Sequence, residues 1–123
     1  MPLMKTSNFR NAGRDPNAVA ICAGVPKGWG GRQYRALAPR WNMLKLPEAE
    51  YRAEYAAILA RLDPAQVFAD LGPDAILLCW EQPGEFCHRR LIAEWLEENL
   101  GVEVPELGTE ARPLGPSADQ RPI

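Results

Sequence analysis

Two cysteines, the only histidine of the chain and two adjacent arginines lie within one short stretch, LLCWEQPGEFCHRRLIAEWL, which runs from Leu77 to Leu96. Thiol and imidazole groups act as nucleophiles, as acids or bases, and as zinc ligands. Arginine side chains bind phosphate and carboxylate groups. The stretch therefore allows four interpretations: a catalytic site, a metal site, an anion-binding site, or an ordinary strand, loop and helix.

The helix that we expect from Glu85 to Leu100 decides where these side chains point. At helical spacing, His88 shares one face with four apolar residues, so we expect its ring to point toward the sheet. Arg90 falls on the opposite face, where an ion pair with Glu94 in solvent is expected. Arg89 lies between the two faces, where its guanidinium can reach a ligand at the start of the helix.

An anion site at the start of this helix is the interpretation that we favour. A helix N-terminus after a strand and a glycine-containing loop presents free N–H groups and the positive end of the helix dipole. We expect Arg89, His88 and Cys79 to surround the ligand, with Cys87 as the candidate nucleophile. Glu81 is the candidate acid or base, which leaves the question of catalysis open.

Two alternatives use the same residues differently. In one, Cys79, Cys87 and His88 bind zinc together with Cys22 or Glu81, although the spacing lacks the usual pair of close cysteines. In the other, His88 is a core histidine bonded to a backbone carbonyl, and the cysteines are small buried apolar residues. Our prediction assigns no metal ligands and names no cofactor.

The segment 24–46 is expected to be a long ordered loop that interleaves aromatic and basic side chains. Such a mixture suits a nucleotide, because aromatic rings stack on bases and cations contact phosphates. We therefore predict a pocket between this loop and the Cys87 helix. The alternative is that the aromatic rings fix the loop to the core while the cations face water. The loop residues assigned to the ligand are Trp29, Arg32, Tyr34 and Arg35.

The order of the expected elements predicts a small three-layer α/β domain with a mostly parallel sheet flanked by helices. A continuously apolar run at 75–80 is typical of a strand covered on both faces. We place the domain at 1–104 and a Pro-rich mobile tail at 105–123. The other expected elements are strands within 2–9 and 17–24, helices at 47–62 and 64–71, and an edge strand at 102–104.

The composition is that of a globular protein, with 46% hydrophobic and 24% charged residues. Residues 1–45 hold eight basic residues and one acidic residue, whereas the whole chain has a net charge of −2. This asymmetry favours a local site for an anion rather than a nonspecific nucleic-acid surface. Three cysteines and no apolar run of membrane-spanning length indicate a cytoplasmic protein with reduced thiols and no membrane partner.

The chain resembles the bacterial and phage family named domain of unknown function 488, over roughly residues 3–100. The resemblance implies a compact α/β domain with a polar centre, and it implies no particular activity. The residues that carry it are Thr6-Ser7-Asn8-Phe9, Leu37-Ala38-Pro39, Leu77-Leu78-Cys79-Trp80-Glu81 and Cys87-His88-Arg89. The implied polar centre consists of Cys79, Glu81, Cys87, His88 and Arg89.

These observations predict a protein that binds a small anionic ligand, either a nucleotide or a nucleic-acid end, beside a reactive thiol. The alternative function is a zinc-binding structural module or a protein-interaction module without turnover of a small molecule.

Overall fold

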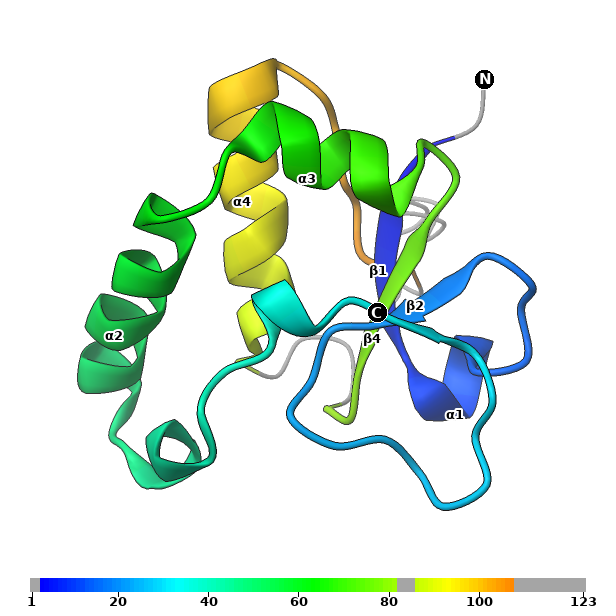
Figure 1. The fold of residues 1–123 in the computed structure, drawn as a ribbon, viewed down its shortest axis with the longest axis horizontal. Helices are drawn as coiled ribbons and strands as arrows, with labels where there is room; N and C mark the ends of the chain where they lie inside the picture. Colours follow the sequence, from blue (N-terminus) through cyan, green and yellow to red (C-terminus); the bar gives the residue numbers. More distant parts are fainter. Residues whose placement is uncertain (1–2, 82–85, 108–123) are drawn as a thin grey trace, which may run out of the picture.

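Figure 1 shows the fold in a computed structural model, which describes residues 3–81 and 86–107 of the chain. None of the helices in this part of the chain has the length and apolar character needed to cross a membrane. The elements, in chain order, are β1 (Lys5–Asn8), α1 (Phe9–Ala12), β2 (Ala18–Ala20), β3 (Arg32–Gln33), the 3-10 helices η1 (Arg35–Leu37) and η2 (Trp41–Lys45), α2 (Glu48–Ala60), α3 (Pro64–Leu71), β4 (Ile76–Cys79) and α4 (His88–Leu100).

The strands form one sheet in the order β1-β4-β2-β3, and every pair of neighbours is parallel. β4 is an inner strand, in which Leu77 pairs with Thr6 of β1 on one side and with Val19 of β2 on the other. All four residues of β4 are buried, as expected for a continuously apolar strand in a parallel sheet. The predicted α/β fold with a parallel sheet is confirmed.

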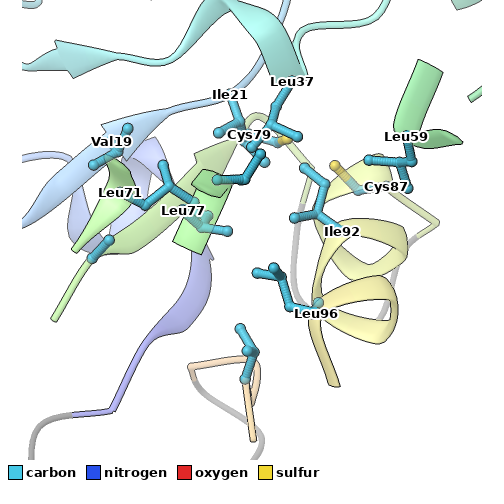
Figure 2. Close-up of a cluster of buried hydrophobic side chains, with 14 of the residues drawn as sticks. Val19, Ile21, Leu37, Leu59, Leu71, Leu77, Cys79, Cys87, Ile92 and Leu96 are labelled. Carbon is cyan, nitrogen blue, oxygen red and sulfur yellow. The ribbon is translucent and has the colours of Figure 1, made fainter. Parts of the chain in front are cut away.

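Helices cover both faces of this sheet. Leu77 and Cys79 of β4 belong to a large buried cluster with side chains of α2, α3 and α4, part of which Figure 2 shows. Ile76 and Leu78 belong to a second, smaller cluster that includes Ala12 of α1. Since alternate residues of a strand point to opposite faces, α2, α3 and α4 lie on one face and α1 on the other. This is the predicted three-layer arrangement.

The helices α2 and α3 form where the apolar spacing predicted them, at 48–60 and 64–71. Asp63 caps α3, because its carboxylate accepts a hydrogen bond from the Ala65 N–H at 3.0 Å. Pro64 follows as the first helical residue, where no N–H partner is needed. Gly72 ends the helix with a φ of 93°, a conformation that glycine adopts without strain.

The segment 24–46 contains more regular structure than the predicted loop. Arg32 and Gln33 extend the sheet as β3, and both side chains are exposed. Because these residues show no apolar alternation, the sequence pattern could not reveal the strand. Leu37 and Met43 anchor the two 3-10 helices, since each is buried in the main core.

The helix α4 begins at His88, three residues later than predicted. Cys87 is extended, with φ −155° and ψ 146°, and so serves as the N-cap residue rather than lying inside the first turn. Residue 85, the predicted start, lies outside the described part of the chain. The predicted end is confirmed, because Gly101 follows the last turn in the left-handed conformation with φ 71°.

The segment after α4 does not form the predicted edge strand at 102–104. Instead, residues 105–107 lie beside β1. The Thr6 N–H donates to the Pro105 carbonyl at 2.9 Å, and the Leu107 N–H donates to the Thr6 carbonyl at 2.8 Å. Glu106 forms an isolated parallel bridge with Thr6. These three residues, which the sequence suggested were tail, therefore belong to the folded domain, while residues 108–123 of the predicted tail lie outside the described residues.

A buried ion pair joins this segment to α4. The Arg89 guanidinium is fully buried and donates to both carboxylate oxygens of Glu106, from Nε at 3.0 Å and from Nη2 at 2.7 Å. Arg90 is not in solvent, which corrects the prediction. Its Nη1 donates to the Thr6 hydroxyl at 2.9 Å and to the Val104 carbonyl at 2.7 Å. The two arginines thus hold the segment 104–107 against β1 and α4.

Replacing Glu106 by glutamine should destabilise the fold, because the buried Arg89 charge loses its carboxylate. We expect the free energy of unfolding to fall by about 3 kcal/mol, measured by urea denaturation followed by circular dichroism. Glu103→Gln is the matched control, because Glu103 is exposed in the same segment, and it should change the value by less than about 0.5 kcal/mol. Equal losses in the two variants would contradict the prediction.

The contribution of this ion pair should depend on pH. Burial by itself would raise the pKa of Glu106, but hydrogen bonds from Arg89 and Thr6 outweigh burial and hold the pKa below its ordinary value. The pairing therefore stabilises the fold above the unfolded-state pKa of about 4.3, and its contribution is lost as the pH falls through the folded-state pKa. The difference in unfolding free energy between the native chain and Glu106→Gln should be full at neutral pH and shrink in acid. A difference that stays constant in acid would show that the charge of Glu106 is not responsible.

Candidate functional site

Three potential ligand or nucleophile atoms converge where β4 ends and α4 begins. Cys79 is the last residue of β4, Cys87 is the N-cap residue of α4, and His88 is its first helical residue. The Cys79 sulfur lies 3.5 Å from each ring nitrogen of His88, and the Cys87 sulfur lies 3.8 Å from His88 Nδ1. Ligands of parallel sheets bind outside the carboxyl ends of the strands, which is where this cluster lies.

The His88 ring is held in one orientation. Its Nε2 lies 2.6 Å from the carbonyl oxygen of Ile21, which follows β2. A carbonyl oxygen only accepts hydrogen bonds, so Nε2 carries a proton. The Tyr55 ring contacts the imidazole edge-to-face, with 5.2 Å between ring centroids. The inward direction predicted for His88 is confirmed by its burial together with Ile92 and Leu96 on one face of α4. The Nδ1 atom is left on the side of the sulfurs.

The two thiols of the cluster ionise differently. Cys79 lies within the core, and burial, together with the hydrogen bond to Cys87, raises its pKa well above the ordinary value. Burial opposes ionisation of Cys87 as well. However, hydrogen bonds from Cys79 and His88 outweigh burial and lower the pKa of Cys87 to about 4. Of the two thiols, Cys87 is therefore the one whose ionisation its surroundings favour.

Two further titratable side chains lie beside this pair. Burial raises the pKa of Glu81 to about 7, and a hydrogen bond with Cys87 and the negative charge of Cys87 add to this rise. Glu81 can therefore hold or release a proton near neutral pH. Burial also raises the pKa of Cys22 to about 11, so this thiol stays protonated. Its sulfur donates a hydrogen bond to the Gly24 carbonyl at 2.9 Å.

These groups line a cavity of about 620 Å³. Most of its wall is apolar or aromatic, and its polar side chains belong to the Cys/His cluster, to Cys22 and to two carboxylates. Trp41, Leu44 and Trp80 are 69%, 49% and 54% exposed, respectively, and so form its rim. The lining residues are Cys22, Ala23, Gly24, Val25, Pro39, Trp41, Leu44, Leu46, Glu48, Tyr51, Cys79, Trp80, Glu81, Phe86, Cys87 and His88.

The 24–46 segment and the start of α4 meet at this cavity. Gly24, Pro39 and Trp41 come from that segment, and Phe86 comes from the residues before α4. The Trp80 indole N–H donates to the Gly24 carbonyl at 2.8 Å, which connects the end of β4 to the segment. A pocket between these two parts of the chain was predicted, although the side chains that the segment supplies are not the predicted ones.

Of the six side chains predicted to bind the ligand, all except Cys79 are directed elsewhere. Arg89 pairs with Glu106 in the core, and Trp29 packs with the α1 cluster, on the face of the sheet opposite Cys79. Arg32 donates to the carbonyls of Asp70 and Leu71, the Tyr34 hydroxyl donates to the Asp70 carboxylate, and Arg35 is exposed. None of these five lines the cavity, whereas the predicted Cys79, Glu81, Cys87 and His88 all do.

The sequence reasoning missed the aromatic part of the site. The sequence pattern placed Tyr51 and Tyr55 only in the helical core, and it left Trp41 among the loop aromatic residues that either stack on a base or fix the loop to the core. A signal was present for Tyr51 and Tyr55, because both recur on the buried face of α2 at a spacing of one turn. No signal in the sequence showed that this face would meet the Cys87 end of α4.

Comparison with models of known protein families, with curated proteins and with solved structures found no match in any of the three searches. The chemistry of the site is therefore argued from its geometry. A thiolate on the wall of an apolar cavity, beside an imidazole and a carboxyl group that titrates near neutral pH, can attack an electrophilic ligand.

The pH dependence of alkylation should separate the three cysteines, all of which are free. With a pKa of about 4, Cys87 should react with iodoacetamide at a nearly constant rate between about pH 6 and pH 8. The reaction of an ordinary thiol slows about tenfold for each unit by which the pH falls below its pKa. Cys22 and Cys79 should react much more slowly. The rates are measured by mass spectrometry of the cysteine peptides.

The matched variants are Cys79→Ser and Cys22→Ser. The further variant Cys79→Ala removes the sulfhydryl donor beside Cys87 and should slow the alkylation of Cys87 at low pH, whereas Cys79→Ser, whose hydroxyl can still donate, and Cys22→Ser should change its pH profile less. If the alkylation of Cys87 in the native chain slows about tenfold for each unit by which the pH falls from 8 to 6, the pKa of Cys87 is not lowered.

Proposed function

We propose that this protein binds a small organic ligand in the cavity at the carboxyl edge of its sheet and reacts with it through the Cys87 thiol. The observation that carries the proposal is the position of this sulfur. It lies on the wall of a cavity of about 620 Å³ and within 3.8 Å of His88 Nδ1. Apolar cavities with a few converging polar groups are the usual form of a small-molecule site.

The proposed reaction is attack of the Cys87 sulfur on an electrophilic centre of the ligand. The sulfur supplies the electron pair of the new bond, and the leaving atom of the ligand departs with the pair from the bond that breaks. Glu81, when protonated, gives its proton to that leaving atom. His88 holds its orientation through Ile21 and so acts as a positioning residue for the Cys87 sulfur.

The sequence predicted a phosphate-bearing ligand, which is a narrower proposal than the small organic ligand described above. The cavity lining, as far as the chain is described, contains the carboxylates Glu48 and Glu81 and no lysine or arginine. Carboxylates repel phosphate, and the arginine predicted to bind it is paired with Glu106. A nucleotide end would therefore depend on the backbone N–H groups at the start of α4. The lining favours a neutral or positively charged ligand with a planar or apolar body.

The cellular setting and the family relationship are proposals as well. Free thiols are maintained in reducing compartments, so three free cysteines support a cytoplasmic location. The resemblance to the domain of unknown function 488 family concerns the residues of the cavity, Cys79, Glu81, Cys87 and His88, and also Arg89. It therefore supports a shared polar centre at this edge of the sheet without adding a substrate.

Saturation of Cys87 alkylation tests the ligand site directly. Two aryl chloroacetamides serve as probes, one neutral and one with a phosphate group on the ring. We expect the neutral probe to show saturation, and Trp41→Ala to raise its half-saturating concentration about tenfold, which corresponds to about 1.4 kcal/mol of lost binding. The limiting rate should be unchanged, because Trp41 is an exposed rim residue and the substitution leaves the contact between Cys87 and His88 in place.

Leu3→Ala is the control, because Leu3 is an exposed apolar residue that does not line the cavity. This variant should leave both the half-saturating concentration and the limiting rate unchanged. If the phosphate probe saturates at the lower concentration, the phosphate proposal is preferred over the neutral ligand. If neither probe saturates, the cavity is not a ligand site for aromatic compounds and the proposal fails.

A further inference from the structure

We propose that Cys79, Cys87 and His88 form a binding site for a zinc ion. Among the described residues these three offer donor atoms that lie within 4.8 Å of one another. Zinc–sulfur bonds of about 2.3 Å and a zinc–nitrogen bond of about 2.0 Å, at tetrahedral angles, separate sulfur from nitrogen by about 3.5 Å. The sulfurs of Cys79 and Cys87 lie 3.5 and 3.8 Å from His88 Nδ1. These two sulfur-to-nitrogen distances are close to those of a tetrahedral zinc site.

The hydrogen bond of His88 prepares the ring for this role. Histidines that bind metals usually donate their second ring N–H to a carbonyl or carboxylate, which fixes the ring and directs the free nitrogen toward the ion. His88 Nε2 is held by the Ile21 carbonyl at 2.6 Å. Nδ1 is then the ring nitrogen that would bind zinc, giving up the proton that it donates to Cys87 in the metal-free chain. The chemistry of the donor set, two thiols and one imidazole, is that preferred by zinc over calcium or magnesium.

One adjustment is needed to complete the site. The Cys79 sulfur is equally far, at 3.5 Å, from both nitrogens of the His88 ring, so ligation through Nδ1 requires this sulfur to shift toward that nitrogen. Ligation also displaces the Cys79 thiol proton to water. Because all three residues line the cavity, the fourth position of the ion is accessible from it. The Glu81 carboxylate lies on the same wall, and zinc accepts carboxylate oxygen or water there.

Zinc in this site would control the chemistry of Cys87. A sulfur whose electron pair is donated to zinc is a much weaker nucleophile toward a carbon electrophile, so the loaded protein should resist alkylation. This consequence rests on the proposed function, in which the Cys87 sulfur attacks a ligand, whereas the metal site itself does not depend on it. The site would then exist in two states, metal-free and reactive or metal-bound and blocked.

The experiment uses the full chain, purified without a metal-affinity tag and treated with a chelator. Zinc is titrated in competition with a chromophoric chelator, and Co²⁺ is used in parallel as a spectroscopic probe of thiolate ligation. We expect one zinc per chain, sulfur-to-cobalt charge-transfer absorption, and slowing of Cys87 alkylation by iodoacetamide when zinc is bound. Cys79→Ser and Cys87→Ser should each weaken zinc binding by at least about 100-fold.

Cys22→Ser is the matched control, because Cys22 lines the same cavity outside the three-residue cluster. It should bind zinc as the native chain does. Circular dichroism of each metal-free variant shows whether it is folded, and zinc affinities are compared only among folded variants. The inference is overturned if the folded native chain binds no zinc, or if Cys22→Ser weakens binding as much as Cys79→Ser does.

The two proposals fail separately. Absence of zinc binding with rapid alkylation of Cys87 would remove the metal site and leave the thiol chemistry. One zinc per chain, with Cys87 in the metal-free chain no more reactive than free cysteine, would support the metal site and remove the thiol chemistry. Zinc bound without any slowing of a rapid Cys87 alkylation would overturn the assignment of Cys87 as a ligand.

Discussion

The burial of β4 on both edges and both faces determines where the other parts of this protein lie. β1 and β2 bond to its two edges in parallel, and helices cover both of its faces. A slip of this strand by one residue would move each side chain to the opposite face and take Cys79 out of the main cluster. Cys79 therefore points to the α4 face, and the chain must leave the sheet directly after it. The site forms at this exit.

A second constraint sets the start of α4. The buried Arg89–Glu106 pair holds the first turn of the helix to the segment that lies beside β1. An unpaired buried guanidinium would be costly, so the helix and the segment depend on each other. The arginine next to Cys87 thus stabilises the position of the site and does not line its cavity. A charged residue beside a nucleophile in sequence is therefore weak evidence for a charged ligand.

The Cys79–Cys87–His88 cluster combines two chemistries that are usually separate. Its hydrogen bonds favour a thiolate on Cys87, which suits attack on an electrophile, and the same three donors are spaced for zinc. Both require the core to hold two sulfurs and an imidazole together. The rigid ring of His88, bonded to Ile21, supports either one.

The sequence by itself determined the layers of the fold, because apolar periodicity and helix-ending residues are local signals. The buried run at Ala75 to Trp80, the helical spacing of α2 and the Asp63-Pro64 start of α3 all predicted elements that the structure contains. The inward direction of His88 followed from the same periodicity. Local pattern also pointed to Cys79, Glu81, Cys87 and His88, since strand and helix ends in a parallel sheet are near each other.

Only the tertiary structure decided what surrounds those residues. The partner of Arg89 lies 17 residues away in a segment with no regular pattern, and Arg90 bonds to β1 across the sheet edge. The aromatic wall requires α2 to meet the start of α4, which depends on how separate elements pack. Spacing along a chain reports the face on which a side chain lies. It does not predict which distant group will lie against that face, because this depends on how the whole core packs.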